Sequence, residues 1–233
     1  NGKVGTLLSG KMWASSDFSP VALIRDSKQQ TKFTALGVPS ILGDLEDGIS
    51  SFLAGFDSII FTAGSGGHTG PEKTTDVDQN AAIKLISDCE KEGVSRFIMV
   101  SAIGADPASE SSRIQHYLRA KGEADLILRN SKLDFTIIAP GSLTDDVGTG
   151  RVQISKKLGF HGTLPREDLA NCIIETLRNF NTIRSSFEVI SGQNKIKNSI
   201  TDLYGGVLPP MTESVLVLDK DFHLPHSSKC CNQ

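Results

Sequence analysis

The sequence lacks the features that mark membrane, secreted and metal-binding proteins. Its apolar runs are short, as at residues 58–63 and 97–100, whereas a membrane-spanning helix needs roughly 20 apolar residues. Residues 1–5 contain no apolar stretch of the kind that a signal peptide carries. The four cysteines show no CxxC or Cys/His spacing typical of zinc sites. We therefore expect reduced thiols, no metal, no membrane segment and a cytoplasmic location.

The sequence also lacks an excess of basic charge. It has 24 Lys and Arg against 27 Asp and Glu, which gives a net charge of −3 and a pI near 6.0. Electrostatic binding of nucleic acid needs a basic face, so we expect no nucleic-acid partner. The 233 residues, of which 38% are hydrophobic, suit one large globular core. Neither composition nor pattern indicates an oligomeric state.

Short apolar runs alternate with longer helical patterns along the chain. The runs are rich in β-branched and aromatic residues and are continuous, which is typical of strands buried on both faces. Alternation with short links predicts an α/β fold of Rossmann type, a doubly wound, mostly parallel sheet with helices on both faces. The expected strands are 21–25, 40–42, 58–63, 97–101, 135–139 and 187–190, and the expected helices are 4–14, 49–53, 78–92, 113–130 and 166–178.

Both ends of the chain depart from this fold. A complete domain of this type starts with a strand that leads into a glycine turn, whereas this sequence begins inside the turn. We therefore expect an N-terminally truncated chain without the first, central strand of the sheet. Residues 1–205 are expected to form the NAD(P)-binding domain and 206–233 an atypical tail. Residues 214–219 predict one more strand, which either fills the vacant central position or forms an edge strand or a loosely attached tail.

The first residues match the end of a G-x-x-G-x-x-G turn directly before a predicted helix. Such a turn lets backbone approach a pyrophosphate, which the helix N-terminus stabilises. Twenty positions later, Arg25 ends the second strand of the fold, where a basic group accepts the 2′-phosphate of NADP and an acid would select NAD. Asp26 should point the other way along the strand. The sequence favours NADP(H) over NAD(H), and the expected contacts of this corner are Gly2, Lys3, Val4, Gly5 and Arg25.

Two segments, 76–104 and 133–143, resemble the extended and atypical short-chain dehydrogenases/reductases, and the resemblance runs to about residue 192. The subgroup includes NmrA-like regulators, flavin reductase-like enzymes and sugar epimerase-like proteins. The resemblance implies that Asp44 faces the adenine amino group, that Leu45 packs on the ring, and that backbone near Ala63 borders the ribose and pyrophosphate. The remaining cofactor contacts that it implies are Gly64, Pro140, Gly141 and Leu143.

The resemblance also implies a catalytic trio of Ser101, Tyr117 and Lys121. The serine ends a predicted strand, and Tyr117 and Lys121 form a YxxxK motif whose spacing places both on one helical face. The ammonium is expected to lower the pKa of the phenol, and Ser101 to hydrogen-bond the substrate oxygen. His68, in the loop after the fourth strand of the fold, is a further candidate, although a lone loop histidine is more often solvated.

These residues predict an NADP(H)-dependent oxidoreductase or epimerase-like enzyme acting on a small carbonyl or hydroxyl substrate. The alternative is an NAD(P)-sensing regulator of NmrA-like type that binds the dinucleotide without turnover, and a third possibility is that the chain does neither. The assignment requires Arg25, Asp44 and Tyr117 to line one shared crevice.

Overall fold

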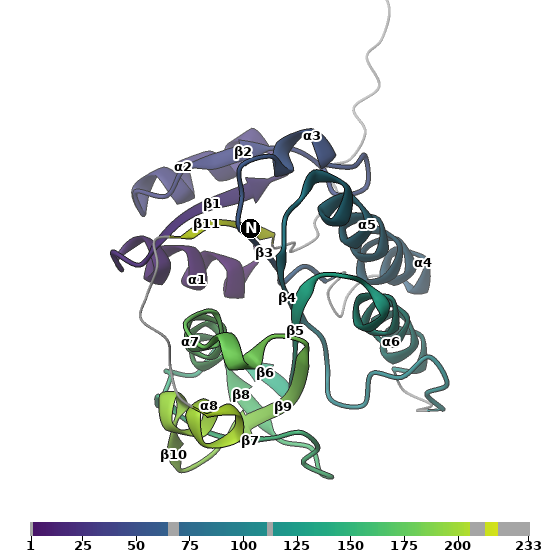
Figure 1. The fold of residues 1–233 in the computed structure, drawn as a ribbon, viewed down its shortest axis with the longest axis vertical. Helices are drawn as coiled ribbons and strands as arrows, with labels where there is room; N and C mark the ends of the chain where they lie inside the picture. The colour runs from purple at the N-terminus through teal and green to yellow at the C-terminus, as the bar shows by residue number, and fades with distance from the viewer. Residues whose placement is uncertain (1, 65–69, 111–113, 206–212, 219–233) are drawn as a thin grey trace, which may run out of the picture.

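The computed structural model describes residues 2–64, 70–110, 114–205 and 213–218. A nine-stranded sheet in the order β10-β7-β9-β5-β4-β3-β11-β1-β2 forms the centre of the molecule, and the strands from β9 to β2 are all parallel (Figure 1). Only β7 and β10 add antiparallel pairs. The strands of this sheet are β1 (Phe18–Ile24), β2 (Ser40–Leu42), β3 (Ser58–Phe61), β4 (Arg96–Val100), β5 (Asp134–Pro140), β7 (Arg151–Ser155), β9 (Ser185–Ser191), β10 (Asn194–Lys195) and β11 (Glu213–Leu218).

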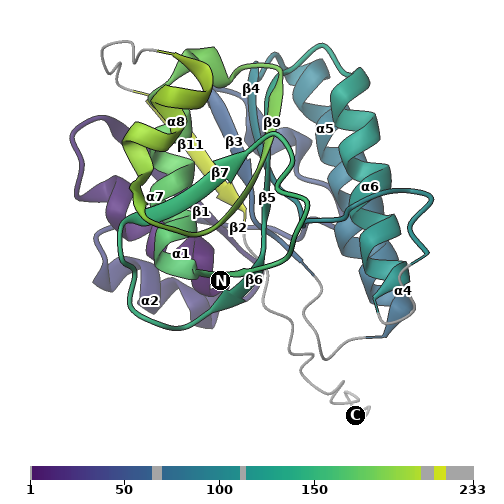
Figure 2. The ribbon, with the colours of Figure 1, turned by 90° about the horizontal axis from the view of Figure 1, so that it is seen from below.

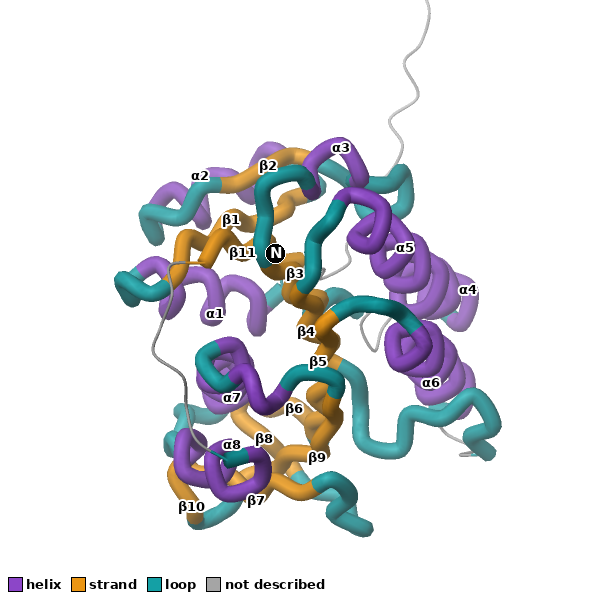
Figure 3. Tube along the Cα trace, in the orientation of Figure 1, coloured by secondary structure: helices purple, strands orange, loops and turns teal. Residues whose placement is uncertain are grey.

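Helices cover both faces of this sheet. Figure 2 shows α4, α5 and α6 on one side and α1, α7 and α8 on the other, and Figure 3 shows the strands as a layer between them. A small parallel pair, β6 (Ser142–Thr144) with β8 (Thr163–Pro165), precedes α7. The helices are α1 (Lys3–Trp13), α2 (Gln30–Ala35), α3 (Ser50–Leu53), α4 (Pro71–Thr74), α5 (Ala82–Glu92), α6 (Gln115–Asn130), α7 (Arg166–Leu177) and α8 (Ile196–Tyr204), with short helical turns η1 (Ser27–Gln29), η2 (Thr75–Ala81, a π-helix) and η3 (Phe180–Thr182).

Two hydrophobic cores form, one on each face of the sheet. Successive side chains of a strand point to opposite faces, so each apolar run feeds both cores. In β4, Phe97 and Met99 join the core under α5 and α6, whereas Ile98 and Val100 join the core under α1 and α7. This arrangement explains why the strands have continuous apolar runs.

Strand β11 lies between β1 and β3, in the central position that the sequence left open. It pairs in parallel with both neighbours, Val21 opposite Leu216 and Ile59 opposite the same residue. Its side chains alternate between the two cores, and Val215 and Leu216 are fully buried. Of the two placements considered for this segment, the central one is observed. The pairing satisfies backbone N–H and C=O groups of β1 and β3 that would otherwise lie unpaired inside the sheet.

The predicted fold class is confirmed, with differences at several elements. The strands expected at 21–25 and 58–63 are observed as β1 and β3 with shifted ends, and the helix expected at 78–92 continues from α4 through the π-helical turn η2. The elements that the sequence did not indicate are mostly short: α2, α4, β6, β7, β8, β10, α8 and the turns η1 and η3. In the part of the chain that the structure describes, no helix is long and apolar enough to cross a membrane.

Candidate functional site

The first turn of α1 presents backbone N–H groups at the end of the sheet where the glycine turn was predicted. Gly2 is the N-cap, and no side chain of a described residue caps the helix. Val4 and Gly5 are buried, whereas the Lys3 side chain lies outward and forms an exposed ion pair with Asp145. The positive dipole end of this helix and the backbone N–H groups of its first turn fit an anionic group.

Arg25 and Asp44 lie beside each other at the ends of two neighbouring strands. Arg25 follows β1, Asp44 follows β2 by two residues, and Nε of Arg25 is 3.9 Å from Oδ2 of Asp44. The side chain of Asp26 caps the turn η1, where its Oδ1 accepts a hydrogen bond from the Lys28 backbone N–H at 2.9 Å. The adjacent Leu45 is buried in the core under α5 and α6. Arg25 therefore places a positive charge at this corner, and the carboxylate beside its guanidinium is that of Asp44.

The ammonium of Lys121 is buried against three oxygen atoms. Its Nζ lies 3.0 Å from Oδ1 of Asp78 and donates to the carbonyls of Ala63 and Val100, both at 3.2 Å. Lys121 is 3% exposed and Asp78 is fully buried. Burial is the largest single effect and acts to lower the pKa of Lys121, but the charge and hydrogen bond of Asp78 together with the effects of Tyr117 and Asp125 outweigh it, and the net pKa is raised. Lys121 therefore stays protonated and ties α6 to the ends of β3 and β4.

Gly64 follows Ala63 and lies against the same carboxylate. A Cβ built on Gly64 would come within 3.2 Å of Oδ1 of Asp78, so a larger residue would crowd the ion pair. Asp78 itself belongs to the π-helical turn η2. A π-turn inside a longer helix is rare and is often found at a functional site. The candidate His68 lies outside the described residues.

Ser101 and Asp125 form a second buried contact next to Lys121. The Ser101 hydroxyl directly follows β4 and donates to Oδ2 of Asp125 at 2.6 Å. The other carboxylate oxygen, Oδ1, is buried and has no hydrogen-bond partner among the residues described. Burial raises the pKa of Asp125 to about 6, against the opposing effects of the Ser101 hydrogen bond and the charges of Lys121 and Arg129. Ser101 thus directs its single proton to Asp125 while that carboxylate is ionised.

The pKa of Tyr117 differs from the sequence prediction. Tyr117 lies in the first turns of α6, and Nζ of Lys121 is 6.0 Å from the centre of its ring. Burial raises the pKa of Tyr117, and the lowering effect of Lys121 is too small to reverse this, because Asp78 and Asp125 add negative charge nearby. The ammonium lowers the pKa of the phenol as expected, but burial with Asp78 and Asp125 outweighs it, so the net pKa lies above the ordinary value instead of below it.

The Pro-Gly turn after β5 is closely packed. The backbone N–H of Gly141 donates to the Val189 carbonyl at 2.9 Å, and a Cβ on Gly141 would come within 2.2 Å of the carbonyl oxygen of Gly162. Leu143 packs against the core under α1 and α7. Pro140 accepts from the backbone N–H of Ile103 at 3.1 Å. Glycine is required here by close backbone approach.

A pocket of about 280 Å³ opens beside the Ser101–Asp125 pair. It lies between the loop that follows Ser101, α6, β5, β9 and the end of β7. Three cationic side chains and three carboxylates line it, together with small and apolar residues. The charged residues are Asp106, Asp125, Arg129, Lys156, Lys157 and Glu188.

The predicted residues share one edge of the sheet. Arg25, Asp44, Ala63, Ser101 and Pro140 stand at or just after the carboxyl ends of parallel strands, which meet at the same edge. Lys121 anchors the Tyr117 helix to two of these strand ends. This is the edge at which open α/β sheets bind ligands. Arg25 and Asp44 are thus brought to the same edge as Ser101, on the opposite side of β11 and β3.

Two buried acids of this site were not singled out from the sequence. Asp125 follows Lys121 by four residues, so the series Tyr117, Lys121, Asp125 on one helical face was a usable signal. Asp78 stands 43 positions before Lys121 in the sequence, so the two residues meet only through tertiary packing.

Comparison with known proteins agrees with this geometry. The chain belongs to the NAD(P)H-binding family, whose model matches residues 1–180. It is 37% identical over 207 residues to YhfK of Bacillus subtilis, named an uncharacterized sugar epimerase, and the match covers 87% of this chain and 96% of the relative.

Two solved structures are also similar. A Bacillus halodurans protein, named as a candidate NAD-dependent epimerase/dehydratase, has a TM-score of 0.82 and 38% identity over 87% of this chain and 96% of its own. The oxidoreductase ylbE of Lactococcus lactis has a TM-score of 0.73 and 28% identity, over 89% of this chain and 95% of its own. The cofactor class is therefore a nicotinamide dinucleotide.

Proposed function

We propose that this protein is an NADP(H)-dependent oxidoreductase or epimerase-like enzyme that acts on a small carbonyl or hydroxyl compound. The observation that carries the proposal is the shared edge, which places Arg25 and Asp44 on one side of β11 and β3 and Ser101, Tyr117 and Lys121 on the other. The names of the similar proteins, an epimerase and an oxidoreductase, support the same reaction class.

The choice of NADP over NAD rests on Arg25. Arg25 lies 3.9 Å from Asp44 and follows the strand end where the adenosine ribose is held in this fold. A planar guanidinium binds a phosphate through two parallel hydrogen bonds. Arg25 would hold the 2′-phosphate, Asp44 and Leu45 the adenine side, and the first turn of α1 with Ala63 and Gly64 the pyrophosphate and ribose.

The reacting group of the site is proposed to be Tyr117 with Ser101. A bound nicotinamide supplies or accepts the hydride. When a carbonyl is reduced, the hydride goes to carbon and the oxygen must gain a proton, which the phenol of Tyr117 would donate while Ser101 holds the oxygen; the phenolate would then regain its proton from water. Pro140, Gly141 and Leu143 would border the ring.

Asp125 is proposed to position Ser101. While Asp125 is ionised it accepts the only hydroxyl proton of Ser101, so that Ser101 can only accept from a substrate hydroxyl. When Asp125 is protonated, Ser101 is released to donate to a substrate carbonyl. The 280 Å³ pocket, whose lining has equal numbers of cations and carboxylates, would receive a small polar substrate beside Ser101.

The second candidate is the dinucleotide-sensing regulator, and one observation favours it. The resemblance also implies that Lys121 holds the nicotinamide ribose. Its ammonium has three hydrogens and already faces three oxygens, so it must exchange one of them before it donates to that ribose. Together with the raised pKa of Tyr117, this arrangement suits a site that binds the cofactor without fast proton transfer.

The test combines binding and turnover. Calorimetric titration with NADPH and NADH gives the cofactor preference, and loss of NADPH absorbance with a panel of aldehydes and ketones gives turnover. Tyr117→Phe should abolish turnover and keep NADPH binding. Tyr204→Phe changes the other tyrosine of the chain, whose hydroxyl donates to the Ser186 carbonyl at 3.0 Å, and should keep both.

Each outcome has a distinct meaning. Turnover that survives Tyr117→Phe would remove Tyr117 from the reaction. NADPH binding without turnover in the unmodified protein favours the regulator, and no binding of either dinucleotide contradicts both candidates.

A further inference from the structure

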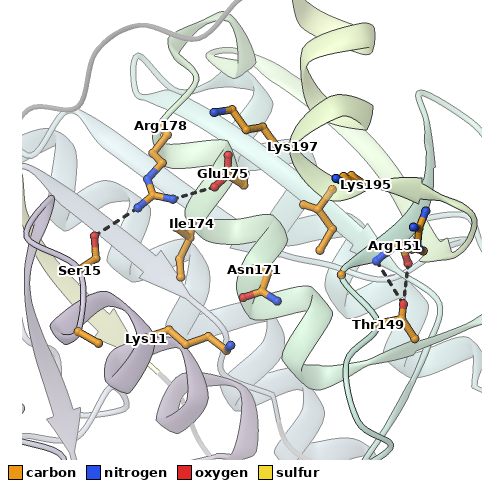
Figure 4. A pocket seen from close by; sticks show the side chains of 13 residues that line it. Lys11, Ser15, Thr149, Arg151, Asn171, Ile174, Glu175, Arg178, Lys195 and Lys197 are labelled. Carbon is orange, nitrogen blue, oxygen red and sulfur yellow. Dashed lines mark hydrogen bonds and ion pairs between the residues drawn. The ribbon is translucent and has the colours of Figure 1, made fainter.

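A second pocket, of about 630 Å³, lies on the opposite face of the sheet from α6. It is formed by the second half of α1, the outer side of α7, residues 149–151 before and at the start of β7, and residues 195–197 at the start of α8. None of these residues belongs to the cofactor or reacting sets described above. Figure 4 shows the labelled side chains surrounding the pocket from these separate elements.

The pocket is strongly basic. Five cationic side chains line it against one carboxylate, Glu175, and that carboxylate is held by Arg178 at 2.7 Å. The cations are Lys11, Arg151, Arg178, Lys195 and Lys197. This surplus of positive charge occurs in a chain whose net charge is −3. Like charges held close together raise each other's energy, so a cluster of this kind is stabilised when an anion enters it.

Three of the five cations have no acidic partner in the part of the chain that the structure describes. Lys11 pairs with Glu167 at 2.9 Å, and Arg178 pairs with Asp17 as well as with Glu175. Arg151 donates only to the Gln193 carbonyl, at 2.6 Å, and Lys195 and Lys197 form no ion pair with a described residue. Their charges are therefore available to a ligand.

Neutral donors and a helix end add to the charge. The first turn of α8, a nine-residue helix, faces the pocket with Lys195 as N-cap, and no described side chain caps it. Asn171, Thr149 and Ser15 contribute an amide and two hydroxyls. The volume lies within the range of roughly 300–1,000 Å³ that is usual for small-molecule sites. Lysines and arginines around a helix N-terminus are the donors that bind phosphate groups.

From this arrangement we propose that the pocket between α1, α7 and α8 is a binding site for a small molecule that carries two or more phosphate groups, separate from the dinucleotide site. Several phosphates are needed to engage all of these cations, because they come from separate elements around the pocket: Lys11 from α1, Arg178 from the end of α7, Arg151 from β7, and Lys195 and Lys197 from the start of α8.

The test uses inorganic tripolyphosphate as the probe and calorimetry as the readout. The titration is run on the full chain with saturating NADPH, so that the proposed dinucleotide site is filled. The double variant Lys195→Gln/Lys197→Gln should weaken tripolyphosphate binding about tenfold, as expected for the loss of two exposed contacts to a multiply charged anion. Lys91→Gln/Lys132→Gln removes the same charge elsewhere on the surface and should leave the affinity within about twofold.

NADPH affinity, measured on the same variants, separates this site from the proposed function, because neither pair of lysines belongs to the cofactor set. The proposal fails if tripolyphosphate does not bind, if NADPH displaces it, or if both double variants bind it equally. It also fails if a short DNA duplex binds these lysines while tripolyphosphate does not, because the surface would then serve a nucleic acid.

Discussion

Removal of the Asp78 carboxylate should strongly destabilise the protein, because it leaves the Lys121 ammonium buried without its counterion. The two groups are 3% and 0% exposed and 3.0 Å apart. Removing one member of a buried pair typically costs about 3–5 kcal/mol. Deprotonation of the lysine sets a ceiling, since releasing a proton of pKa about 10.4 at pH 7 costs roughly 4.6 kcal/mol. The carbonyls of Ala63 and Val100 remain and keep the loss below that ceiling.

The assay is urea unfolding followed by circular dichroism at pH 7. Asp78→Asn should lower the free energy of unfolding by about 3–4 kcal/mol, which corresponds to roughly 10 °C in Tm for a chain of this size. Asp78→Asn combined with Lys121→Met removes both charges and should be more stable than Asp78→Asn alone, because no buried charge is left unpaired. Asp145→Asn, which removes an exposed carboxylate paired with Lys3 and Arg166, serves as the control and should leave the urea midpoint unchanged.

The reasoning would be refuted if Asp78→Asn cost less than about 1 kcal/mol, which is below the range for a broken buried pair. It would also be refuted if the double variant lost the sum of the two single losses, because additivity means that the two side chains do not interact.

Three further predictions concern cofactor choice, pH dependence and thiol reactivity. Arg25→Ala should weaken NADPH binding about ten- to a hundredfold and leave NADH nearly unchanged, and an equal loss for both in a fluorescence titration would contradict the phosphate role. Folding raises the pKa of Asp125 from 3.8 to about 6, so its contribution to the free energy of unfolding is present below pH 4 and is lost as the pH rises through 6. The free energy of unfolding of Asp125→Asn should therefore increase by roughly 3 kcal/mol relative to that of the unmodified protein between pH 4 and 7, measured by urea unfolding. Parallel pH curves for the two proteins would exclude the shift. Burial raises the pKa of Cys89 to about 12 and that of Cys172 further, so mass spectrometry after brief alkylation at pH 8 should find neither thiol modified until the protein is unfolded.

The sequence by itself determined the fold class and the order of the functional residues along the sheet. Runs such as Phe97 to Val100 are continuous because both faces of a parallel strand are buried, so they identify the strands without any knowledge of packing. Arg25 and Ser101 stand at strand ends, and parallel strands place such ends at one edge. The spacing between Tyr117 and Lys121 is a local property of a helix.

Tertiary structure alone decided the electrostatics of the site and the place of the last strand. The net direction of the shift in the pKa of Tyr117 depends on burial and on Asp78, which reaches the site from another helical segment and opposes the lowering effect of Lys121. The apolar pattern of β11 suits a central or an edge position equally. In the folded protein β11 lies centrally, because there it pairs with backbone groups of both β1 and β3 that would otherwise lie unpaired inside the sheet. The basic pocket between α1, α7 and α8 has no sequence signal, because its cations come from segments between 11 and 197 that only folding brings together.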